Sequence, residues 1–313
     1  MKYVDSCGLP PAVLRALVND PYVRKADIST TTLIKPVQMV ALERRYEDRL
    51  KAEAMDSVWA LFGQSVHKIL ERGIKDGVLI EQSFFYTHNG WTLSGTVDII
   101  EDGILDDYKV TSAWAILNGV KDEWKKQLNV NRFLAMRNGL LIDRLRIVAI
   151  LRDWTKLQAT RHQSFSNQQL VILEVEPLPL NLVEAYVHQR MRGHQKALEL
   201  KPSELPECSP QERWQRPDQW AVHKLKKDGD PLQSAYRVLE DEDKAYELAQ
   251  EMNDKGKACY RVIARPGESV RCKRYCAVAP FCSQHRKMEG GSDESSPEAP
   301  GDPKVRGLAE EGQ

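Results

Sequence analysis

The sequence predicts a mixed α/β fold with strands and helices alternating along the chain. Apolar side chains recur at helical spacing over residues 52–75, and three strand-like runs follow directly. A second helical pattern and a further apolar strand come next, which is typical of an α/β core. A chain of 313 residues, 42% of them hydrophobic, is long enough for about two domains with sizeable cores.

Each element has its own signal in the sequence. Residues 28–36, ISTTTLIKP, predict an extended segment with helical patterns on either side. Period-2 and apolar runs predict the later strands, and 3.6-residue periodicity predicts the later helices. The expected strands are 79–87, 91–100, 104–110, 145–151 and 170–176, and the expected helices are 52–75, 121–137 and 181–199.

The composition changes after residue 200, because four prolines fall between residues 202 and 217. We therefore predict a core over residues 1–200 and a cysteine-rich C-terminal module over residues 201–287. Within this module, residues 219–265 predict a small β-β-α-β unit. Residues 288–313 carry seven acidic and two basic side chains with little to bury, which predicts a disordered acidic tail.

Charge and hydropathy exclude some classes of protein. The 45 basic and 45 acidic residues cancel, so no global positive field indicates a nucleic-acid partner. Without the tail, the first 287 residues carry a net charge of +5, which permits a local basic surface. The chain has no apolar run long enough for a signal peptide or a membrane span, so we expect a cytoplasmic protein with no membrane contact.

The most informative segment is TLSGTVDIIEDGILDDYKVT, residues 92–111. Two apolar, β-branched runs flank Asp102-Gly103, a dipeptide that favours a two-residue type I′ turn. Such a turn places Asp98 opposite Asp107, and Lys109 shares a face with Asp107 because side chains alternate along a strand. We therefore expect Asp98, Asp107 and Lys109 to converge on one patch.

Opposed carboxylates repel each other unless a cation lies between them. Carboxylate oxygens on a rigid hairpin suit Mg²⁺ or Mn²⁺, and Mg²⁺ keeps several waters when only one or two carboxylates bind it. The pair Asp98 and Asp107 therefore predicts a divalent-metal site, with Lys109 placed to stabilise charge on a phosphate. The alternative is a solvated edge hairpin whose charges only keep the sheet soluble.

The same residues resemble the PD-(D/E)XK nuclease superfamily, and are most similar to its RecB-type exonuclease branch. GTVD, a turn and LDDYK match the family's G-x-x-D … D-x-K signature, and the resemblance covers residues 28–200. Upstream, GQSVHKILE matches the family's G-x-x-x-H-x-x-x-E motif through Gly63, His67 and Glu71. Downstream, WKKQLNVNRF supplies Gln127, with Asn131 where the family usually has Tyr.

The resemblance implies a restriction-endonuclease-like core, in which a mixed central sheet is flanked by helices. Taken alone, His67 is also compatible with a structural hydrogen bond to Glu71. Glu81 is either a further acidic group near the site or a solvated residue, and we expect the second. The roles that the resemblance implies are metal ligation by His67, Asp98 and Asp107, catalysis by Lys109 and support by Gln127.

Six cysteines are too few for a disulfide scaffold in a chain of this length, and a cluster of them indicates a metal site. Cys272, Cys276 and Cys282 lie within eleven residues, and Cys208 is our preferred fourth ligand. The arrangement is similar to RecB-type nucleases that bind a [4Fe-4S] cluster, whose lone cysteine precedes the core and would correspond to Cys7. Zn²⁺ is the alternative metal, and unligated thiols are the remaining alternative.

These features predict a Mg²⁺- or Mn²⁺-dependent deoxyribonuclease that acts as an exonuclease on DNA. A resemblance to RecB-like nucleases of tailed bacteriophages, which extends to Arg152-Asp153-Trp154, implies phage or bacterial DNA processing with a recombination or annealing protein as a further partner. One alternative is a non-catalytic DNA-binding or scaffolding protein that keeps the nuclease fold. Another is a sequence-specific endonuclease, which would need an element that reads base edges.

Overall fold

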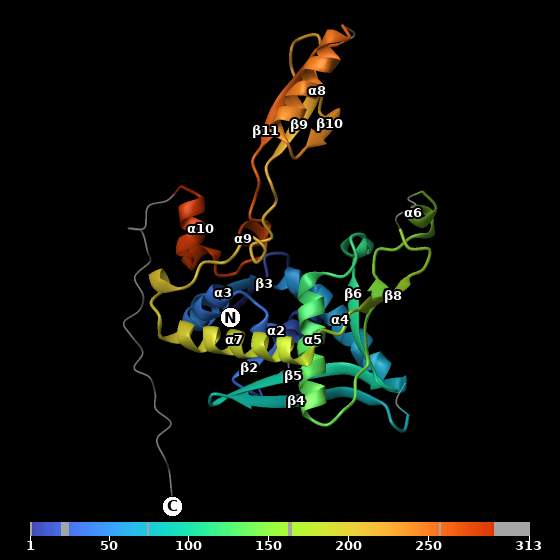
Figure 1. Ribbon diagram of the computed structural model, residues 1–313, viewed down its shortest axis with the longest axis vertical. Helices are drawn as coiled ribbons and strands as arrows, with labels where there is room; N and C mark the ends of the chain where they lie inside the picture. The colour runs from blue at the N-terminus through green and yellow to red at the C-terminus, as the bar shows by residue number, and fades with distance from the viewer. Residues whose placement is uncertain (1, 20–24, 74, 162–164, 257, 291–313) are drawn as a thin grey trace, which may run out of the picture. The chain divides into compact units, whose positions relative to one another are not determined.

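The computed structural model (Figure 1) divides into two compact units, Met1–Pro206 and Glu207–Gln313. The division lies six residues beyond the boundary that we place after residue 200. None of the helices in the described ranges combines the length and the apolar composition needed to cross a lipid bilayer. The structure describes residues 2–19, 25–73, 75–161, 165–256 and 258–290.

Unit 1 is built around a six-stranded mixed sheet flanked by helices, the α/β architecture that the sequence predicts. The strand order is β2-β5-β6-β7-β8, and β4 also pairs with β5. β4, β5 and β6 form an antiparallel meander, whereas β6 and β7 are parallel. The strands are β2 (Ile28–Ser29), β4 (Leu79–His88), β5 (Trp91–Glu101), β6 (Ile104–Thr111), β7 (Arg144–Leu151) and β8 (Leu170–Val175).

β5 is the strand around which the sheet is arranged. β4 pairs with β5 along most of its length, so β2 and β6 share the other edge of β5. On that edge β6 pairs with residues 99–101 and β2 with residues 93–94. The four residues between these two ladders, Gly95 to Asp98, therefore form a fork where β5 has no strand neighbour on this edge.

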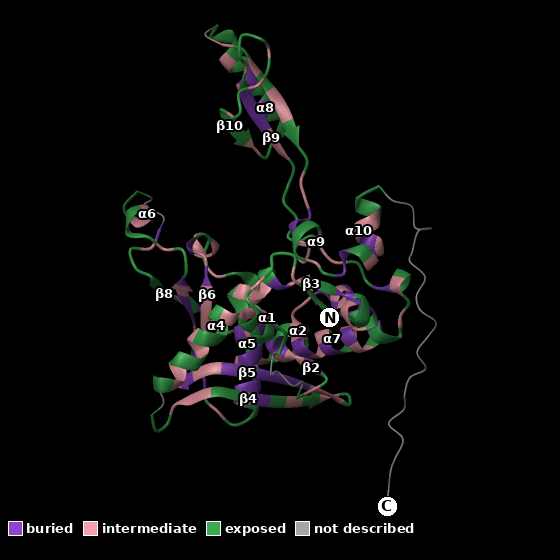
Figure 2. Ribbon diagram, turned by 180° about the vertical axis from the view of Figure 1, so that it is seen from behind, coloured by how far each residue is buried: buried purple, intermediate pink, exposed green. Residues whose placement is uncertain are grey.

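Two long helices supply most of the apolar surface that covers this sheet. α5 (Asp122–Arg137) and α7 (Leu180–Glu199) contribute Phe133, Leu134 and Met191 to the main core, together with residues of β5, β6 and β7. Figure 2 shows the buried residues concentrated on β5 and α5. The other helices of unit 1 are α1 (Pro11–Val18), α2 (Thr30–Leu33), α3 (Val37–Arg45), α4 (Val58–Leu70) and α6 (Lys156–Arg161).

Two sequence-based expectations for the N-terminal region are wrong in detail. Residues 30–33 form the helical turn α2 instead of an extended segment, because the Ser29 hydroxyl accepts the N–H of Thr32 and caps the turn. The helix expected over residues 52–75 is shorter and spans Val58–Leu70 as α4. Residues 51–53 instead form β3, which pairs in parallel with β1 (Lys2–Val4), and a 3₁₀ turn at Ala54–Ser57 follows it.

Gly95 explains how α5 can approach β5 at the fork. A Cβ atom at this position would lie 2.5 Å from both Asn131 Oδ1 and Leu134 Cδ1 on α5, and 2.7 Å from Thr30 Oγ1. Such distances are too short for any side chain, so only glycine lets the helix pack this closely. Asn131 is itself buried, and its amide donates a 3.3 Å hydrogen bond to the Thr96 carbonyl on β5.

Unit 2 contains the β-β-α-β order expected for residues 219–265. Its three-stranded antiparallel sheet, in the order β10-β9-β11, packs against α8 through Val222, Ala245 and Ala249. The tail expected from residue 288 lies almost entirely outside the described residues, although Met288 itself ends α10. The elements are β9 (Gln219–Lys224), β10 (Arg237–Leu239), α8 (Glu242–Asp254), β11 (Tyr260–Arg265), α9 (Val270–Arg274) and α10 (Ser283–Met288).

Gly95→Ala should destabilise the chain by about 1–3 kcal/mol, because the methyl group overpacks a contact between helix and strand that cannot relax freely. Urea unfolding measures the change. Gly193→Ala is the matched control, because a Cβ on this α7 residue meets only Val37 at 3.5 Å. In a helix interior this control should be neutral or stabilising by up to about 1 kcal/mol. Equal effects of the two substitutions would contradict the close approach of α5.

Candidate active site

The β5–β6 hairpin has the turn and register that the sequence predicts. Asp102 and Gly103 have φ values of 48° and 75°, as both central residues of a type I′ turn require. Ile99 pairs with Asp106, so Asp98 and Asp107 are the next residues to face each other. At this point the ladder ends and the fork in β5 begins.

Asp98 holds the two strands together where the ladder ends. Its Oδ2 atom accepts a 2.6 Å hydrogen bond from the backbone N–H of Tyr108, a group that regular pairing would direct to the carbonyl of Val97. A side chain therefore replaces the backbone acceptor. This substitution fixes the Asp98 carboxylate beside β6 while leaving its second oxygen available.

A third carboxylate lies in the same row of the sheet. β4 pairs Ile80 with Ile99 and Gln82 with Val97, which places Glu81 opposite Asp98. Glu81 has a φ of 50°, a left-handed conformation that costs a non-glycine residue roughly 1–2 kcal/mol. Strain of this kind persists where the surroundings impose it, and here it accompanies a side chain directed at the site.

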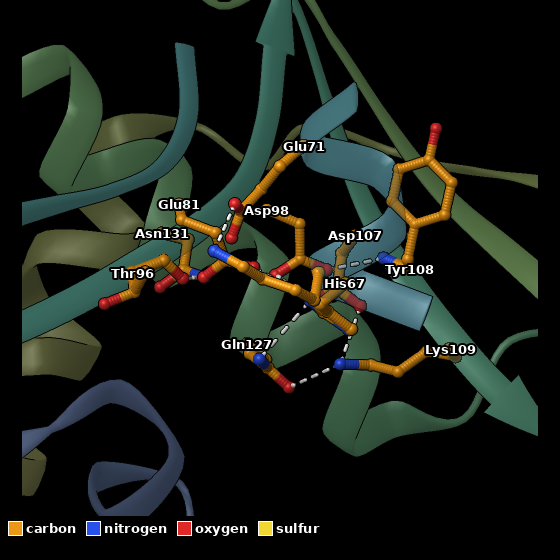
Figure 3. Close-up of polar contacts among 11 residues, drawn as sticks. His67, Glu71, Glu81, Thr96, Asp98, Asp107, Tyr108, Lys109, Gln127 and Asn131 are labelled. Carbon is orange, nitrogen blue, oxygen red and sulfur yellow. Dashed lines mark hydrogen bonds and ion pairs between the residues drawn. The ribbon is translucent and has the colours of Figure 1, made fainter. Parts of the chain in front are cut away.

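His67 on α4 completes this group (Figure 3). Its Nδ1 atom lies 3.0 Å from Glu81 Oε1 and 3.7 Å from Asp98 Oδ1. The hydrogen bond to Glu81 raises the pKa of His67, as does the charge of Asp98, whereas burial opposes the shift. Glu71 takes no part in this contact, because it pairs with Lys68 at 2.5 Å.

Asp107, Lys109 and Gln127 form the other half of the site. Lys109 Nζ lies 2.7 Å from Asp107 Oδ2 and 3.5 Å from Gln127 Oε1. The Gln127 amide in turn donates to Asp107 Oδ1 at 3.3 Å, so the three polar groups close a ring. Gln127 reaches these residues from α5, one helical turn before Asn131, whose close contact with Gly95 sets the position of the helix.

The electrostatics of the site favour a further positive charge. Burial and the nearby Asp107 carboxylate raise the pKa of Asp98 to about 7, although His67, Lys109 and the Tyr108 N–H lower it. Asp107 is only 3% exposed, and its Oδ2 atom has no hydrogen bond despite its short contact with Lys109. Asp107 is buried and the facing Asp98 is half-buried, and two carboxylates so placed are costly unless a cation neutralises them.

The donor set fits a hard divalent cation. One ligand atom each from His67, Glu81 and Asp98 lies within 4.8 Å of the others. The carboxylate oxygens suit Mg²⁺ or Mn²⁺, whereas the one imidazole is a softer donor that is more typical of later transition metals. Asp107 faces Asp98 across the fork and offers an additional oxygen.

The structure brings together every residue that the sequence nominates for this site: His67, Asp98, Asp107, Lys109 and Gln127. The expectation that Glu81 is merely solvated is wrong, because Glu81 contacts His67 directly. The sequence signal that could have placed Glu81 in the site is a second two-residue turn at Asn89-Gly90, which has φ values of 49° and 74°. Its register alone places Glu81 opposite Asp98.

In unit 2 the four expected cysteine ligands are close enough to influence one another. Burial, the charge of Glu212 and the thiols of Cys282, Cys272 and Cys276 together raise the pKa of Cys208 to about 12. None of the four forms a disulfide. Among the described residues no three of these thiol sulfurs lie within 4.8 Å of one another.

Cys208 is fixed to the segment that carries Cys282. The Gln284 side chain accepts the N–H of Cys208 at 2.8 Å and donates to its carbonyl at 2.9 Å. Gln284 is buried in α10, which begins directly after Cys282. Burial raises the pKa of the Cys282 thiol, although the backbone N–H groups of His285 and Gln284 oppose this shift. Cys7, the other candidate for the fourth ligand, is exposed in unit 1.

No family model matches the chain, and no curated protein matches it. Among solved structures, the chain is similar to one described as "Crystal structure of SSO0001", with a TM-score of 0.39 and 18% sequence identity. The similarity covers 58% of this chain and 82% of that chain. A likeness of this degree carries no information about the chemistry of the site.

In EDTA, Asp98→Asn should raise the melting temperature at pH 8 by a few degrees. Because the folded pKa of about 7 exceeds the unfolded value of 3.8, the folded chain keeps a proton that the unfolded chain has lost between these pH values. Stability therefore falls as the pH rises through this window. The amide removes this penalty, so the difference between variant and wild type should grow from about pH 5 to pH 8 in thermal unfolding scans.

Asp106→Asn is the matched control, because the side chain of Asp106, on the neighbouring strand β6, is 10% exposed against 14% for Asp98 but accepts two 2.6 Å hydrogen bonds from Arg146. Removing its charge leaves Arg146 uncompensated and should lower the melting temperature. Mg²⁺ at pH 8 should stabilise the wild type and not Asp98→Asn. A loss of stability in Asp98→Asn equal to that in Asp106→Asn would contradict the interpretation that the charged Asp98 carboxylate destabilises the folded chain.

Proposed function

We propose that the chain is a metal-dependent deoxyribonuclease of the PD-(D/E)XK type, similar to RecB-like exonucleases, that hydrolyses phosphodiester bonds from DNA ends. The observation that carries this proposal is the grouping of Asp98 and Asp107 at the fork in β5 with Lys109 beside them. Two facing carboxylates next to a lysine, one of them Asp98 with a pKa raised by burial and by the Asp107 charge, form a site that can bind a cation and a phosphate together. The order of the sequence motifs supports the same assignment.

In this proposal Asp98, Asp107 and His67 hold the divalent cation, with Glu81 as a further ligand. When bound, the cation would supply a Lewis acid for the phosphate oxygens and lower the pKa of a coordinated water. Glu81 also orients His67 through the 3.0 Å hydrogen bond to Nδ1, the ring nitrogen that lies 3.7 Å from Asp98 Oδ1.

Lys109 has a separate role in this mechanism. Its ammonium group, held between Asp107 and Gln127, donates to a non-bridging phosphate oxygen and stabilises the charge that develops during attack. Gln127 keeps both Lys109 and Asp107 in place, so we assign it a positioning role. The Tyr108 N–H prevents the Asp98 carboxylate from rotating away from the phosphate.

We also propose that Cys208, Cys272, Cys276 and Cys282 bind a [4Fe-4S] cluster, with Zn²⁺ as the alternative occupant. The four thiols lie in one unit and form no disulfide, so they are suitable donors for either group. Burial raises the pKa of Cys272 and Cys282, whereas nearby arginines and backbone N–H groups favour their thiolate forms. Such a centre would tie the Cys208 loop to α9 and α10, at the base of the β-β-α-β segment.

Asp107→Ala and Lys109→Ala should each reduce DNA cleavage by at least about 100-fold, because each removes a group that stabilises charge on the reacting phosphate. Cleavage of end-labelled linear DNA and of circular DNA, with Mg²⁺, Mn²⁺ or EDTA, measures both activity and end dependence. Lys35→Ala is the control, because Lys35 forms a partly exposed ion pair with Glu43. It should retain wild-type activity.

Wild-type rates in Lys109→Ala would overturn the active-site assignment. Cutting of circular DNA would replace exonuclease by endonuclease activity. A folded protein that binds DNA but cleaves none with either metal would favour the non-catalytic alternative.

Cys276→Ser should lower the metal content of anaerobically purified protein and destabilise unit 2, because one ligand of the centre is lost. Iron, sulfide and zinc determinations on the same sample identify the occupant. Cys7→Ser and Cys259→Ser are the controls, because both thiols are exposed and stand outside the proposed ligand set. Equal metal loss in Cys7→Ser and Cys276→Ser would exclude Cys208 as the lone fourth ligand.

A further inference from the structure

Helix α4 carries His67 into the site, yet none of its residues is buried. Trp59 and Phe62 are 55% and 44% exposed, and their rings meet edge to face with centroids 6.3 Å apart. Leaving two large aromatic side chains in water forgoes several kcal/mol of burial, at roughly 1.5–3 kcal/mol for each side chain. An exposed aromatic cluster beside a candidate active site therefore indicates a binding surface.

Arg152 adds a positive charge to this cluster. Its guanidinium lies 4.2 Å from the centroid of the Trp59 ring. The backbone at this point is tied down, because the Arg152 N–H donates to the Thr111 carbonyl and Asp153 accepts the N–H of Ala113. A guanidinium stacked on an indole keeps its N–H groups in the plane, where they can bind a phosphate.

Helix and strand geometry place Trp59 and Arg152 at similar distances from the candidate active site. Trp59 lies eight residues before His67 on α4, which corresponds to about 12 Å along the helix. β6 and β7 pair Lys109 with Ala149, so Arg152 lies three residues beyond this row, or about 10 Å along the sheet. At about 3.4 Å per step of a stacked strand, both values correspond to about three nucleotides.

We infer that Trp59, Phe62 and Arg152 form a stacking platform for unpaired bases of a DNA strand whose phosphate is bound at Asp107 and Lys109. The inference rests on the proposed nuclease function and adds its substrate class, DNA with a single-stranded end. An aromatic ring can stack on any unpaired base, whereas the faces of duplex bases are covered by their neighbours. Arg152 supplies a contact to a phosphate of the same strand.

The charge on the platform distinguishes this occupant from a protein partner. An apolar helix docked on Trp59 and Phe62 would bury the Arg152 guanidinium without an anion, which is costly. A nucleic-acid strand offers a base and a phosphate together, so both the rings and the cation are satisfied.

The experiment measures binding of a fluorescent single-stranded oligonucleotide and of a blunt duplex to the full chain, with Ca²⁺ in place of Mg²⁺ and intact DNA verified on a gel. Trp59→Ala should weaken single-strand binding about tenfold or more, and Phe62→Ala and Arg152→Ala should weaken it to a smaller extent. Duplex binding should change less than twofold. Leu182→Ala on α7, which removes a 58% exposed apolar side chain, is the control and should bind like wild type.

An oligonucleotide with abasic sites about three nucleotides from the cleaved phosphate adds a second test of position, since each step of a stacked strand spans about 3.4 Å. The abasic change should weaken binding to the wild type but cause little further loss in Trp59→Ala, because both changes remove the same contact. Additive losses, or equal losses on duplex and single strand, would overturn the platform. If the wild type cleaves DNA and Trp59→Ala binds equally well, only this inference fails; if the wild type neither binds nor cleaves any DNA, the proposed function fails with it.

Discussion

The candidate site depends on a fork in the sheet. Because β4 occupies one edge of β5, β2 and β6 must share the other, and residues 95–98 between them have no strand partner on that edge. At this gap, side chains form hydrogen bonds with backbone groups that have no partner strand. Asp98 accepts the Tyr108 N–H, and Asn131 donates to the Thr96 carbonyl. Closing the fork with regular pairing would satisfy the backbone and remove the space in which the proposed cation and phosphate would bind.

Turn chemistry made part of this site predictable, since a two-residue turn dictates register without reference to the rest of the fold. Asp102-Gly103 therefore led to Asp98, Asp107 and Lys109, and the same logic at Asn89-Gly90 leads to Glu81. Contacts between segments that are distant in the sequence could not be predicted from the register of a turn. The proximity of Arg152 to Trp59 depends on how α4 lies beside β6, and the shortening of α4 depends on β3, whose partner is a strand at the N-terminus.

The charged groups of the sheet show why burial alone does not identify function. Asp106 and Asp107 are neighbours on β6, both buried, but they face opposite sides of the sheet. Asp106 is neutralised by the two-point contact with Arg146 and serves the fold. Asp107 instead faces Asp98, where burial and the charge of Asp107 raise the pKa of the Asp98 carboxyl. The lysine beside Asp107, Lys109, also contacts Gln127.

The meander of β4, β5 and β6 also determines which length changes the chain can tolerate. Surface loops usually accept insertions, because their backbone makes few contacts. The tips at Asn89-Gly90 and Asp102-Gly103 stand at the ends of the hairpins, and all of these residues except Gly103 are exposed, yet the two tips align the carboxylate row. One added residue at either tip would shift a strand by one position and turn Glu81 or Asp107 to the opposite face. These two surface turns are therefore as restrictive in length as a buried segment.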